Sequence, residues 1–245
     1  MEPWYEWSFQ EDYLKIYAHR DENQAMRELE KLLTYIPHKP RQKVLDLCCG
    51  QGRHSRWLDR QGFDVVGVDL SSVLLQEAIK NTLDLPVQYM RADARRVRFN
   101  EEMDLVVNLF TSFGYFDEDE ENEQVLHAVS RSLKPRGYFL LDYLNPDFLT
   151  TNLEPFTQTF MKNIEILQYR TLTEQYVHKR IIIKEDETEK SYEEKVKLYR
   201  LEQLVPMLER NHLHLQYVFG NYDTSGFIAS TSPRMILICR KNKNL

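Results

Sequence analysis

The sequence has few of the features of membrane, secreted or nucleic-acid-binding proteins. No apolar run in its 245 residues approaches the roughly 20 residues that a membrane-spanning helix needs. Only three cysteines occur, and two of them are adjacent, Cys48 and Cys49, which is not the disulfide framework of a secreted domain. The start of the chain has no basic segment followed by an apolar stretch, so we expect no signal peptide and a cytoplasmic protein.

Charge of either sign is nearly balanced. The chain has 32 Lys and Arg against 38 Asp and Glu, a formal net charge of −6. This balance argues against binding to nucleic acid, because phosphate contacts need clustered basic residues. His212 and His214 have no cysteine or acidic cluster beside them, so we expect no metal site. A chain with 42% hydrophobic residues is an ordinary globular protein.

Apolar segments alternate with helical patterns over the first part of the chain after residue 40. We expect strands at 44–47, 63–68, 87–90, 103–110 and 138–143, and helices at 53–61, 72–81 and 119–133. This alternation predicts right-handed crossovers and a mostly parallel sheet with helices on both faces. We expect residues 1–40 to form a helical segment that ends at Pro37 and Pro40, and residues 134–137 to form a tight turn.

The pattern changes after residue 150. Charged and apolar residues alternate roughly in 157–170, 174–184 and 191–200, which predicts two or three antiparallel strands with a turn at 185–187. A helix over 201–211, which includes Pro206, and strands at 213–219 and 235–239 follow. We therefore expect one α/β domain with an antiparallel β insertion after its fifth strand.

The loop between the first strand and the first helix of the sheet favours a ligand that contains a nucleoside. Gly50 and Gly52 let the backbone approach a ligand closely, and the helix that follows offers free N–H groups. Asp69, which ends the second strand, is placed to accept the hydroxyls of a ribose. An NAD-binding loop needs a third glycine where Ser55 stands, so the match to an oxidoreductase is incomplete. The Asp46 carboxylate suits a ligand with an ammonium group, such as S-adenosylmethionine.

Five motifs resemble those of class I S-adenosylmethionine-dependent methyltransferases, in the same order along the chain. The segments are Val44-Leu45-Asp46-Leu47-Cys48-Cys49-Gly50-Gln51-Gly52-Arg53-His54, Val66-Gly67-Val68-Asp69-Leu70-Ser71, Arg91-Ala92-Asp93-Ala94, Asp104-Leu105-Val106-Val107-Asn108-Leu109-Phe110 and Leu133-Lys134-Pro135-Arg136-Gly137. Cys48 stands where the family's first glycine usually lies. The resemblance implies a Rossmann-like seven-stranded sheet whose last strand is antiparallel.

The resemblance also implies roles for individual residues. Asp46 would hold the amino group of the methionine end, directly or through water. Gly50 and Gly52 would pass under the cofactor, Asp69 would bind the ribose and Leu70 would pack on the adenine. Asp93 and the Ala94 N–H would bind the adenine edge, and Asn108 and Leu109 would lie beneath the sulfonium. Tyr17 and Arg20 are candidates for the methionine carboxylate. For the acids, capping or turn formation is the alternative interpretation, and it is strongest for Asp93.

The predicted organisation follows from these motifs. Residues 1–40 form a lid, 41–150 the cofactor-binding core, 151–200 an insertion over the substrate site, and 201–245 the helix and strands that complete the core. Tyr115, Tyr143 and Tyr222 are candidates for the acceptor site. The insertion resembles that of small-molecule N-methyltransferases, so we expect methyl transfer to a nitrogen or oxygen of a small molecule. A homodimer through the insertion, and a non-catalytic S-adenosylmethionine-binding subunit, remain open.

Overall fold

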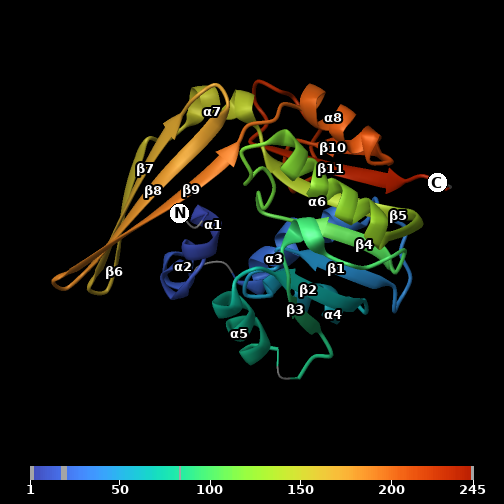
Figure 1. The fold of residues 1–245 in the computed structure, drawn as a ribbon, viewed down its shortest axis with the longest axis horizontal. Helices are drawn as coiled ribbons and strands as arrows, with labels where there is room; N and C mark the ends of the chain where they lie inside the picture. The colour runs from blue at the N-terminus through green and yellow to red at the C-terminus, as the bar shows by residue number, and fades with distance from the viewer. Residues whose placement is uncertain (1–2, 18–20, 83, 244–245) are drawn as a thin grey trace.

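A seven-stranded sheet forms the centre of the computed structural model, which describes residues 3–17, 21–82 and 84–243 (Figure 1). The strand order is β10-β11-β5-β4-β1-β2-β3, and β11 is antiparallel to both of its neighbours. The strands are β1 (Lys43–Leu47), β2 (Asp64–Asp69), β3 (Gln88–Arg91), β4 (Met103–Asn108), β5 (Leu133–Leu144), β10 (Leu213–Phe219) and β11 (Arg234–Lys241). The predicted Rossmann-like fold with an antiparallel last strand is confirmed.

Helices pack on both faces of this sheet because successive residues of each strand point to opposite sides. In β1, Val44 joins a core cluster with α3 and α4, whereas Leu45 and Leu47 join the cluster with α6 and α8. The side chains of both clusters are almost fully shielded from solvent, so the central strands are mostly apolar. The helices beside the sheet are α3 (Glu22–Leu33), α4 (Arg53–Arg60), α5 (Ser72–Lys80), the 3-10 turn η1 (Ala94–Arg96), α6 (Asp119–Ser132), α7 (Pro146–Asn152) and α8 (Leu201–Arg210).

Two local predictions differ from the structure. The N-terminal segment holds the short helices α1 (Trp4–Trp7) and α2 (Glu11–Ile16) before α3, which ends at Leu33, ahead of the two prolines. Residues 134–137 are predicted to form a turn, but they belong to β5. Arg136 has φ +67°, and the pairing of β5 with β4 shifts register between Met103 and Leu105, so the segment is an irregular strand start.

The insertion is a separate antiparallel sheet in the order β6-β7-β8-β9, which projects from the body of the molecule (Figure 1). Its strands are β6 (Phe156–Met161), β7 (Ile164–Leu172), β8 (Tyr176–Glu185) and β9 (Thr188–Lys197). The prediction of one strand over 157–170 is wrong, because the chain reverses at Lys162, which has φ +55°. No glycine marks that turn in the sequence. The turn at Asp186, with φ +53°, is where the sequence predicts it.

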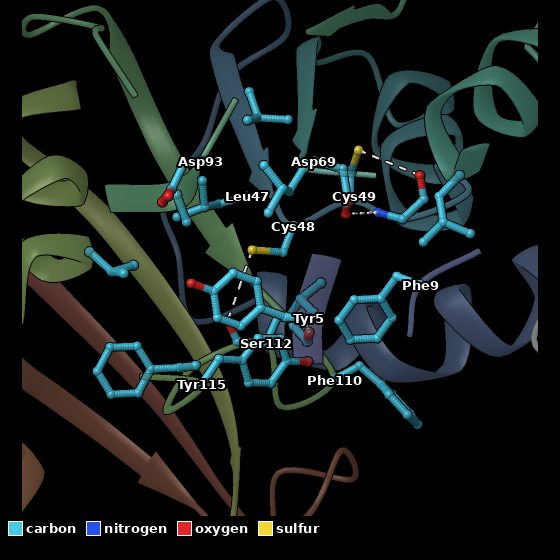
Figure 2. A pocket seen from close by; sticks show the side chains of 18 of the residues that line it. Tyr5, Phe9, Leu47, Cys48, Cys49, Asp69, Asp93, Phe110, Ser112 and Tyr115 are labelled. Carbon is cyan, nitrogen blue, oxygen red and sulfur yellow. Dashed lines mark hydrogen bonds between the residues drawn. The ribbon is translucent and has the colours of Figure 1, made fainter. Parts of the chain in front are cut away.

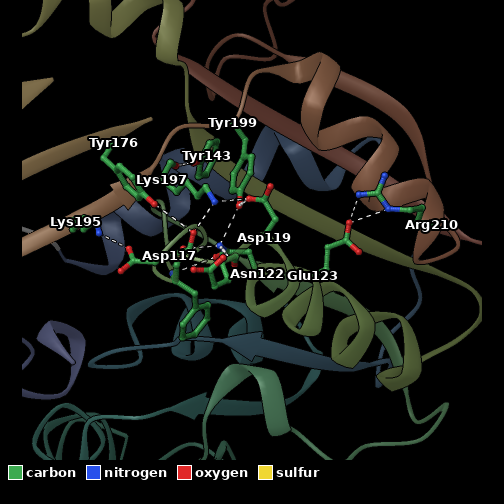
Figure 3. A network of polar contacts seen from close by, with 12 residues as sticks. Asp117, Asp119, Asn122, Glu123, Tyr143, Tyr176, Lys195, Lys197, Tyr199 and Arg210 are labelled. Atoms are coloured by element: carbon green, nitrogen blue, oxygen red, sulfur yellow. Dashed lines mark hydrogen bonds and ion pairs between the residues drawn. The ribbon is translucent and has the colours of Figure 1, made fainter. Parts of the chain in front are cut away.

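Two sets of contacts tie the insertion to the rest of the molecule. At one end, Lys197 and Tyr199 bind Asp119 at the start of α6, and Lys195 pairs with Asp117 (Figure 3). Along the sheet, the N-terminal segment packs against it. Asp12 of α2 accepts hydrogen bonds from Lys190 at 2.8 Å and from Tyr192 at 2.5 Å. The N-terminal segment is therefore held between the insertion and the core.

Candidate functional site

A cavity opens where β1, β2 and β4 end, beneath the N-terminal segment (Figure 2). The core contributes the glycine loop, the tip of β2, the segment after β3 and the loop after β4. The N-terminal segment covers these with aromatic rings. The cavity residues that bear on binding are Tyr5, Phe9, Tyr13, Tyr17, Cys48, Gly50, Arg53, Asp69, Leu70, Asp93, Ala94, Leu109, Phe110 and Tyr115.

The two glycines of the loop differ in what they do. Gly50 has φ +55° and lines the cavity, so its missing side chain leaves the backbone open to a ligand. Gly52 has φ +76° and lies outside the cavity lining. A Cβ on Gly52 would collide with the Tyr89 hydroxyl. The second glycine is therefore needed for the turn and for packing against β3.

Asp69 joins the tip of β2 to the glycine loop. Its Oδ2 accepts the Gly50 N–H at 2.8 Å, and its Oδ1 accepts the Ser71 N–H at 2.8 Å. Burial raises the pKa of Asp69, although these backbone hydrogen bonds oppose that effect. Each carboxylate oxygen keeps a second lone pair, and the side chain lines the cavity. Both oxygens can therefore accept a hydroxyl from a ligand while they hold the loop.

Asp46 and Asn108 lie beneath the cavity, outside its lining. Asp46 is 1% exposed, and its Oδ2 accepts the Ser55 hydroxyl at 2.6 Å. Burial raises the pKa of Asp46. Asn108 donates to the Leu47 carbonyl at 3.1 Å, and its own Oδ1 has no hydrogen-bond partner among the described residues. Asp46 therefore braces the start of α4, and Asn108 braces the end of β1.

Asp93 both caps a turn and faces the cavity. Its Oδ1 accepts the Arg95 N–H at 2.8 Å, and its Oδ2 forms an ion pair with the Arg95 guanidinium at 2.5 Å. Burial acts to raise the pKa of Asp93, but the bonds from Arg95 outweigh it and lower the pKa. Ala94 follows in the lining, as do Leu70 after β2 and Leu109 after β4. The structure thus brings these four residues together around one cavity.

Of the two N-terminal residues predicted to bind the methionine carboxylate, only one lies among the described residues. Tyr17 lines the cavity, and its hydroxyl donates to Glu194 of β9 at 3.1 Å. Arg20 lies outside the described residues, so its role stays a prediction.

Arg53 is a cavity residue to which the sequence motifs assign no role. It is 6% exposed, and its Nη1 lies 2.8 Å from Glu28 Oε2, which His54 Nε2 also contacts at 2.8 Å. Burial acts to raise the pKa of Glu28, but His54 and Arg53 outweigh it and lower the pKa. Arg53 Nη2 has no hydrogen-bond partner among the described residues. The signal in the sequence is its position as first residue of the helix after the glycine loop.

Of the three tyrosines predicted for the acceptor site, one lines the cavity. Tyr115 does, and burial raises its pKa well above the usual value. Tyr143 is fully buried in the core, and its hydroxyl donates to the Lys197 carbonyl. Tyr222 donates to Asp142 Oδ2 at 2.6 Å and lies outside the lining. Tyr143 and Tyr222 therefore support the walls and do not face the space.

The paired cysteines are both free thiols. Cys48 lines the cavity with φ +63°, and its Sγ points to the Ser112 carbonyl at 3.9 Å (Figure 2). Burial raises the pKa of both thiols well above the usual value, so neither is a reactive thiolate. Cys48 thus fills the position of the family's first glycine as a small packed side chain.

Known proteins that are similar to this chain are methyltransferases. Residues 44–137 match a family model described as a methyltransferase domain. The putative methyltransferase YqeM of Bacillus subtilis (strain 168) is 31% identical over 159 residues, 64% of this chain and 62% of YqeM. The cypemycin N-terminal methyltransferase of a Streptomyces species is 37% identical over 103 residues, 42% of each chain. The chain thus spans between about two fifths and three fifths of the length of these relatives.

The fold comparison extends over nearly the whole chain. The crystal structure of an S-adenosylmethionine-dependent methyltransferase from Clostridium acetobutylicum ATCC 824 has a TM-score of 0.80 and 20% identity, and covers 94% of this chain and 96% of that one. The chain thus contains a match to a methyltransferase domain at residues 44–137 and shares the fold of this solved methyltransferase. Within residues 3–17, 21–82 and 84–243, no helix is long and apolar enough to cross a membrane. The same residues contain no group of acids, histidines and cysteines placed to hold a metal ion.

Proposed function

We propose that this chain transfers the methyl group of S-adenosylmethionine to a nitrogen atom of a small molecule. The observation that carries the proposal is one cavity that combines the Gly50 backbone, the Asp69 carboxylate and a cover of aromatic rings. When bound, S-adenosylmethionine supplies an electrophilic methyl: the acceptor lone pair forms the new N–C bond, the C–S bond breaks with its electrons passing to sulfur, and one acceptor proton goes to solvent. The protein must therefore bind, align and exclude water.

The cavity residues fit the parts of this donor. Asp69 is assigned to the ribose hydroxyls, because its oxygens keep free lone pairs that face the space. Asp93, the Ala94 N–H and Leu70 are assigned to the adenine, and Leu109, with Asn108 below it, to the neighbourhood of the sulfonium. The unpartnered Nη2 of Arg53, buried at the edge of the cavity, is suited to the methionine carboxylate, beside Tyr17. Asp46 would reach the ammonium group only through an intervening water, because it lies beneath the loop.

Aromatic rings favour nitrogen as the acceptor atom. Phe9 lies 5.9 Å from Tyr115 in a stacked arrangement, and Trp4 packs edge-on against Tyr115 at 4.9 Å between centroids. Ring faces attract cations, so they stabilise both a sulfonium donor and the ammonium product of N-methylation. The cypemycin relative, named for an N-terminal methyltransferase activity, is consistent with this choice.

Calorimetry with Asp69→Asn tests the donor site. Removing one charged acceptor should weaken S-adenosylmethionine binding about 10- to 100-fold, because a hydrogen bond to a charged group contributes about 1.5–3 kcal/mol. Asp64→Asn is the matched control, since Asp64 begins the same strand at its exposed end. Equal affinities for the two variants, or no binding to the unmodified chain, would contradict the assignment. Release of S-adenosylhomocysteine with a panel of amines then tests turnover.

A further inference from the structure

A second cavity adjoins the first on the side of the insertion. Its walls come from the N-terminal segment, the loop after β4, helix α7, the inner face of the insertion sheet, the end of β5 and the start of β11. Part of it is apolar, lined by Leu149 of α7, by Leu153 just after that helix, and by Val177 and Val196 of the insertion. The same face of the insertion carries a polar row, because Arg170 of β7, Lys179 of β8 and Glu194 of β9 are register partners.

Aromatic side chains line the border between the two cavities. The residues that line both are Phe9, Tyr13, Tyr17, Phe110 and Tyr115. Tyr13 and Tyr17 lie 4.5 Å apart, and Phe9 and Tyr13 lie 5.1 Å apart, between ring centroids. These rings therefore form an aromatic border that both cavities share. A molecule that extends from the second cavity to the first passes beside ring faces and edges.

The charges of the second cavity do not cancel. Its lining holds three cations, Arg170, Lys179 and Arg234, and one acid, Glu194. Two of the cations have acidic partners. Lys179 Nζ lies 3.4 Å from Glu194 Oε2, and Arg234 Nη2 lies 2.7 Å from Asp142 Oδ1, a fully buried carboxylate.

Arg170 is the cation whose described contacts are all to neutral oxygens. Its guanidinium donates to the Glu154 carbonyl and the Thr157 hydroxyl, each at 3.2 Å, and to the Gln168 side-chain oxygen at 3.0 Å. No acidic side chain among residues 3–17, 21–82 and 84–243 lies within ion-pair distance of it in this structure. A partly buried guanidinium of this kind is suited to an oxyanion, which it binds with two parallel N–H bonds.

We infer that the second cavity holds the methyl acceptor, and that Arg170 binds an oxyanion, a carboxylate or a phosphate, at the end of the acceptor remote from its amine. The inference rests on the proposed function. The amine lies at the shared aromatic border, where it can reach into the first cavity and where ring faces favour a cation. The oxyanion lies at the polar row of the insertion. The acceptor is thus a short amine with an anionic group, and the insertion selects it.

A matched acceptor series tests this class on the full chain. Each series contains an amino carboxylate, an aminoalkyl phosphate with the same number of carbons, and the neutral carboxamide of the first. Formation of S-adenosylhomocysteine gives kcat and KM for each amine. We expect either the amino carboxylate or the aminoalkyl phosphate to show a KM at least 10-fold below that of the carboxamide. The compound that does so identifies which oxyanion the site binds. Equal KM values for anionic and neutral amines, or no turnover of any anionic amine, overturn the inference.

Variants of Arg170 assign the effect to this residue. Arg170→Gln should raise the KM of the anionic acceptor 10- to 100-fold and leave the dissociation constant of S-adenosylmethionine within about 2-fold. Arg170→Lys keeps the positive charge but loses the planar guanidinium. Its KM for the anionic acceptor should lie between those of the unmodified chain and Arg170→Gln, which separates loss of anion binding from loss of fold. Arg180→Gln is the control. Lys179 faces the cavity, so Arg180, the next residue of the same strand, points to the opposite face and is exposed. If Arg170→Gln raises KM no more than Arg180→Gln does, Arg170 is not the anion site.

The same measurements separate the two proposals. If the unmodified chain does not bind S-adenosylmethionine, the proposed function fails and this inference fails with it. If the chain binds the donor and methylates neutral amines as well as anionic ones, the proposed function stands and only the inference fails.

Discussion

The two sheets of this protein are built by different rules, and the difference separates their tasks. The central strands of the seven-stranded sheet, β1, β4 and the second half of β5, are buried on both faces and are largely apolar. The insertion buries one face, where Ile166, Ile181 and Ile183 pack on Ile16 and Tyr17. The first sheet forms, at its strand ends, the cavity to which we assign S-adenosylmethionine. The second supplies side chains, Arg170 among them, that line the second cavity.

Two buried carboxylates, one in the core and one in the N-terminal segment that packs on the insertion, also differ in their surroundings. Asp46 of the core is 1% exposed and Asp12 of the N-terminal segment is 4% exposed, so both are removed from water. Burial raises the pKa of Asp46, whose hydrogen-bond donors are the Ser55 side chain and backbone. Burial also acts to raise the pKa of Asp12, but hydrogen bonds from Lys190, Tyr192 and Lys15 outweigh it, so that pKa is lowered. Asp12 thus accepts hydrogen bonds from two lysines, whereas Asp46 accepts none from a charged group.

The largest expected effect concerns the rigidity of the core loop. Gly52→Ala should lower the free energy of unfolding by about 3 kcal/mol, from a left-handed backbone, about 1–2 kcal/mol, and a forced shift of Tyr89, about 1–3 kcal/mol. Gly62→Ala shares the positive φ, +91°, but its Cβ would meet nothing within 4 Å, so it should lose only the backbone contribution. Denaturant unfolding of both variants checks this. Equal losses would show that Tyr89 moves freely.

The next effect concerns the attachment of the insertion to the N-terminal segment. Asp12→Asn should lower the free energy of unfolding by about 1–3 kcal/mol at pH 7, because it leaves Lys190 and Tyr192 without a charged acceptor. Since the folded pKa is lowered, this stability is present above the unfolded pKa and is lost as pH falls through the folded pKa. Variant and unmodified chain should therefore converge in strongly acidic solution. A difference that is constant across pH would contradict the ion-pair explanation.

Asp46→Asn should show the opposite pH dependence, because burial raises the pKa of Asp46 in the folded chain. Because the folded pKa is raised, the unmodified chain loses stability as pH rises from the ordinary value of 3.8 through the folded pKa. The stability of the variant relative to the unmodified chain should grow over this range and then stay level. Urea unfolding at a series of pH values measures it. A difference that shrinks with rising pH would mean that Asp46 is better solvated than its burial implies.

The smallest effect is expected at the exposed ion pair between Lys195 and Asp117. The Asp117 side chain is 63% exposed, so solvent screens the pair. Lys195→Gln should change the free energy of unfolding by less than about 0.5 kcal/mol. A thermal or denaturant melt at low and moderate salt checks this, and a loss above about 1 kcal/mol would show that the insertion depends on this contact.

The sequence predicts the core well for a physical reason. Strands covered on both faces must be apolar along their whole length, and crossover connections leave their strand ends on one edge. The positions of Asp69 and Gly50 in the cavity lining follow from that alone. The insertion is predicted less well. Its edge strand β6 is largely exposed, so little apolar periodicity marks it, and the turn at Lys162 has no glycine or proline.

The sequence position of a residue does not determine whether its side chain points into the cavity or into the core. Tyr115 and Tyr143 share one predicted site, yet only Tyr115 faces it, because the alternation of β5 turns Tyr143 into the core. No sequence motif singles out Arg53, because its burial against Glu28 depends on α3, a segment distant in sequence.

The sequence by itself determined the layered sheet, the glycine loop and the acid that ends β2, since these depend on local apolar patterns and on backbone conformations that particular residues favour. Only the tertiary structure decided that the N-terminal aromatic rings and the inner face of the insertion enclose a second cavity. Those surfaces meet through contacts between Asp12 and Tyr192, 180 positions apart in the chain, which no local pattern records.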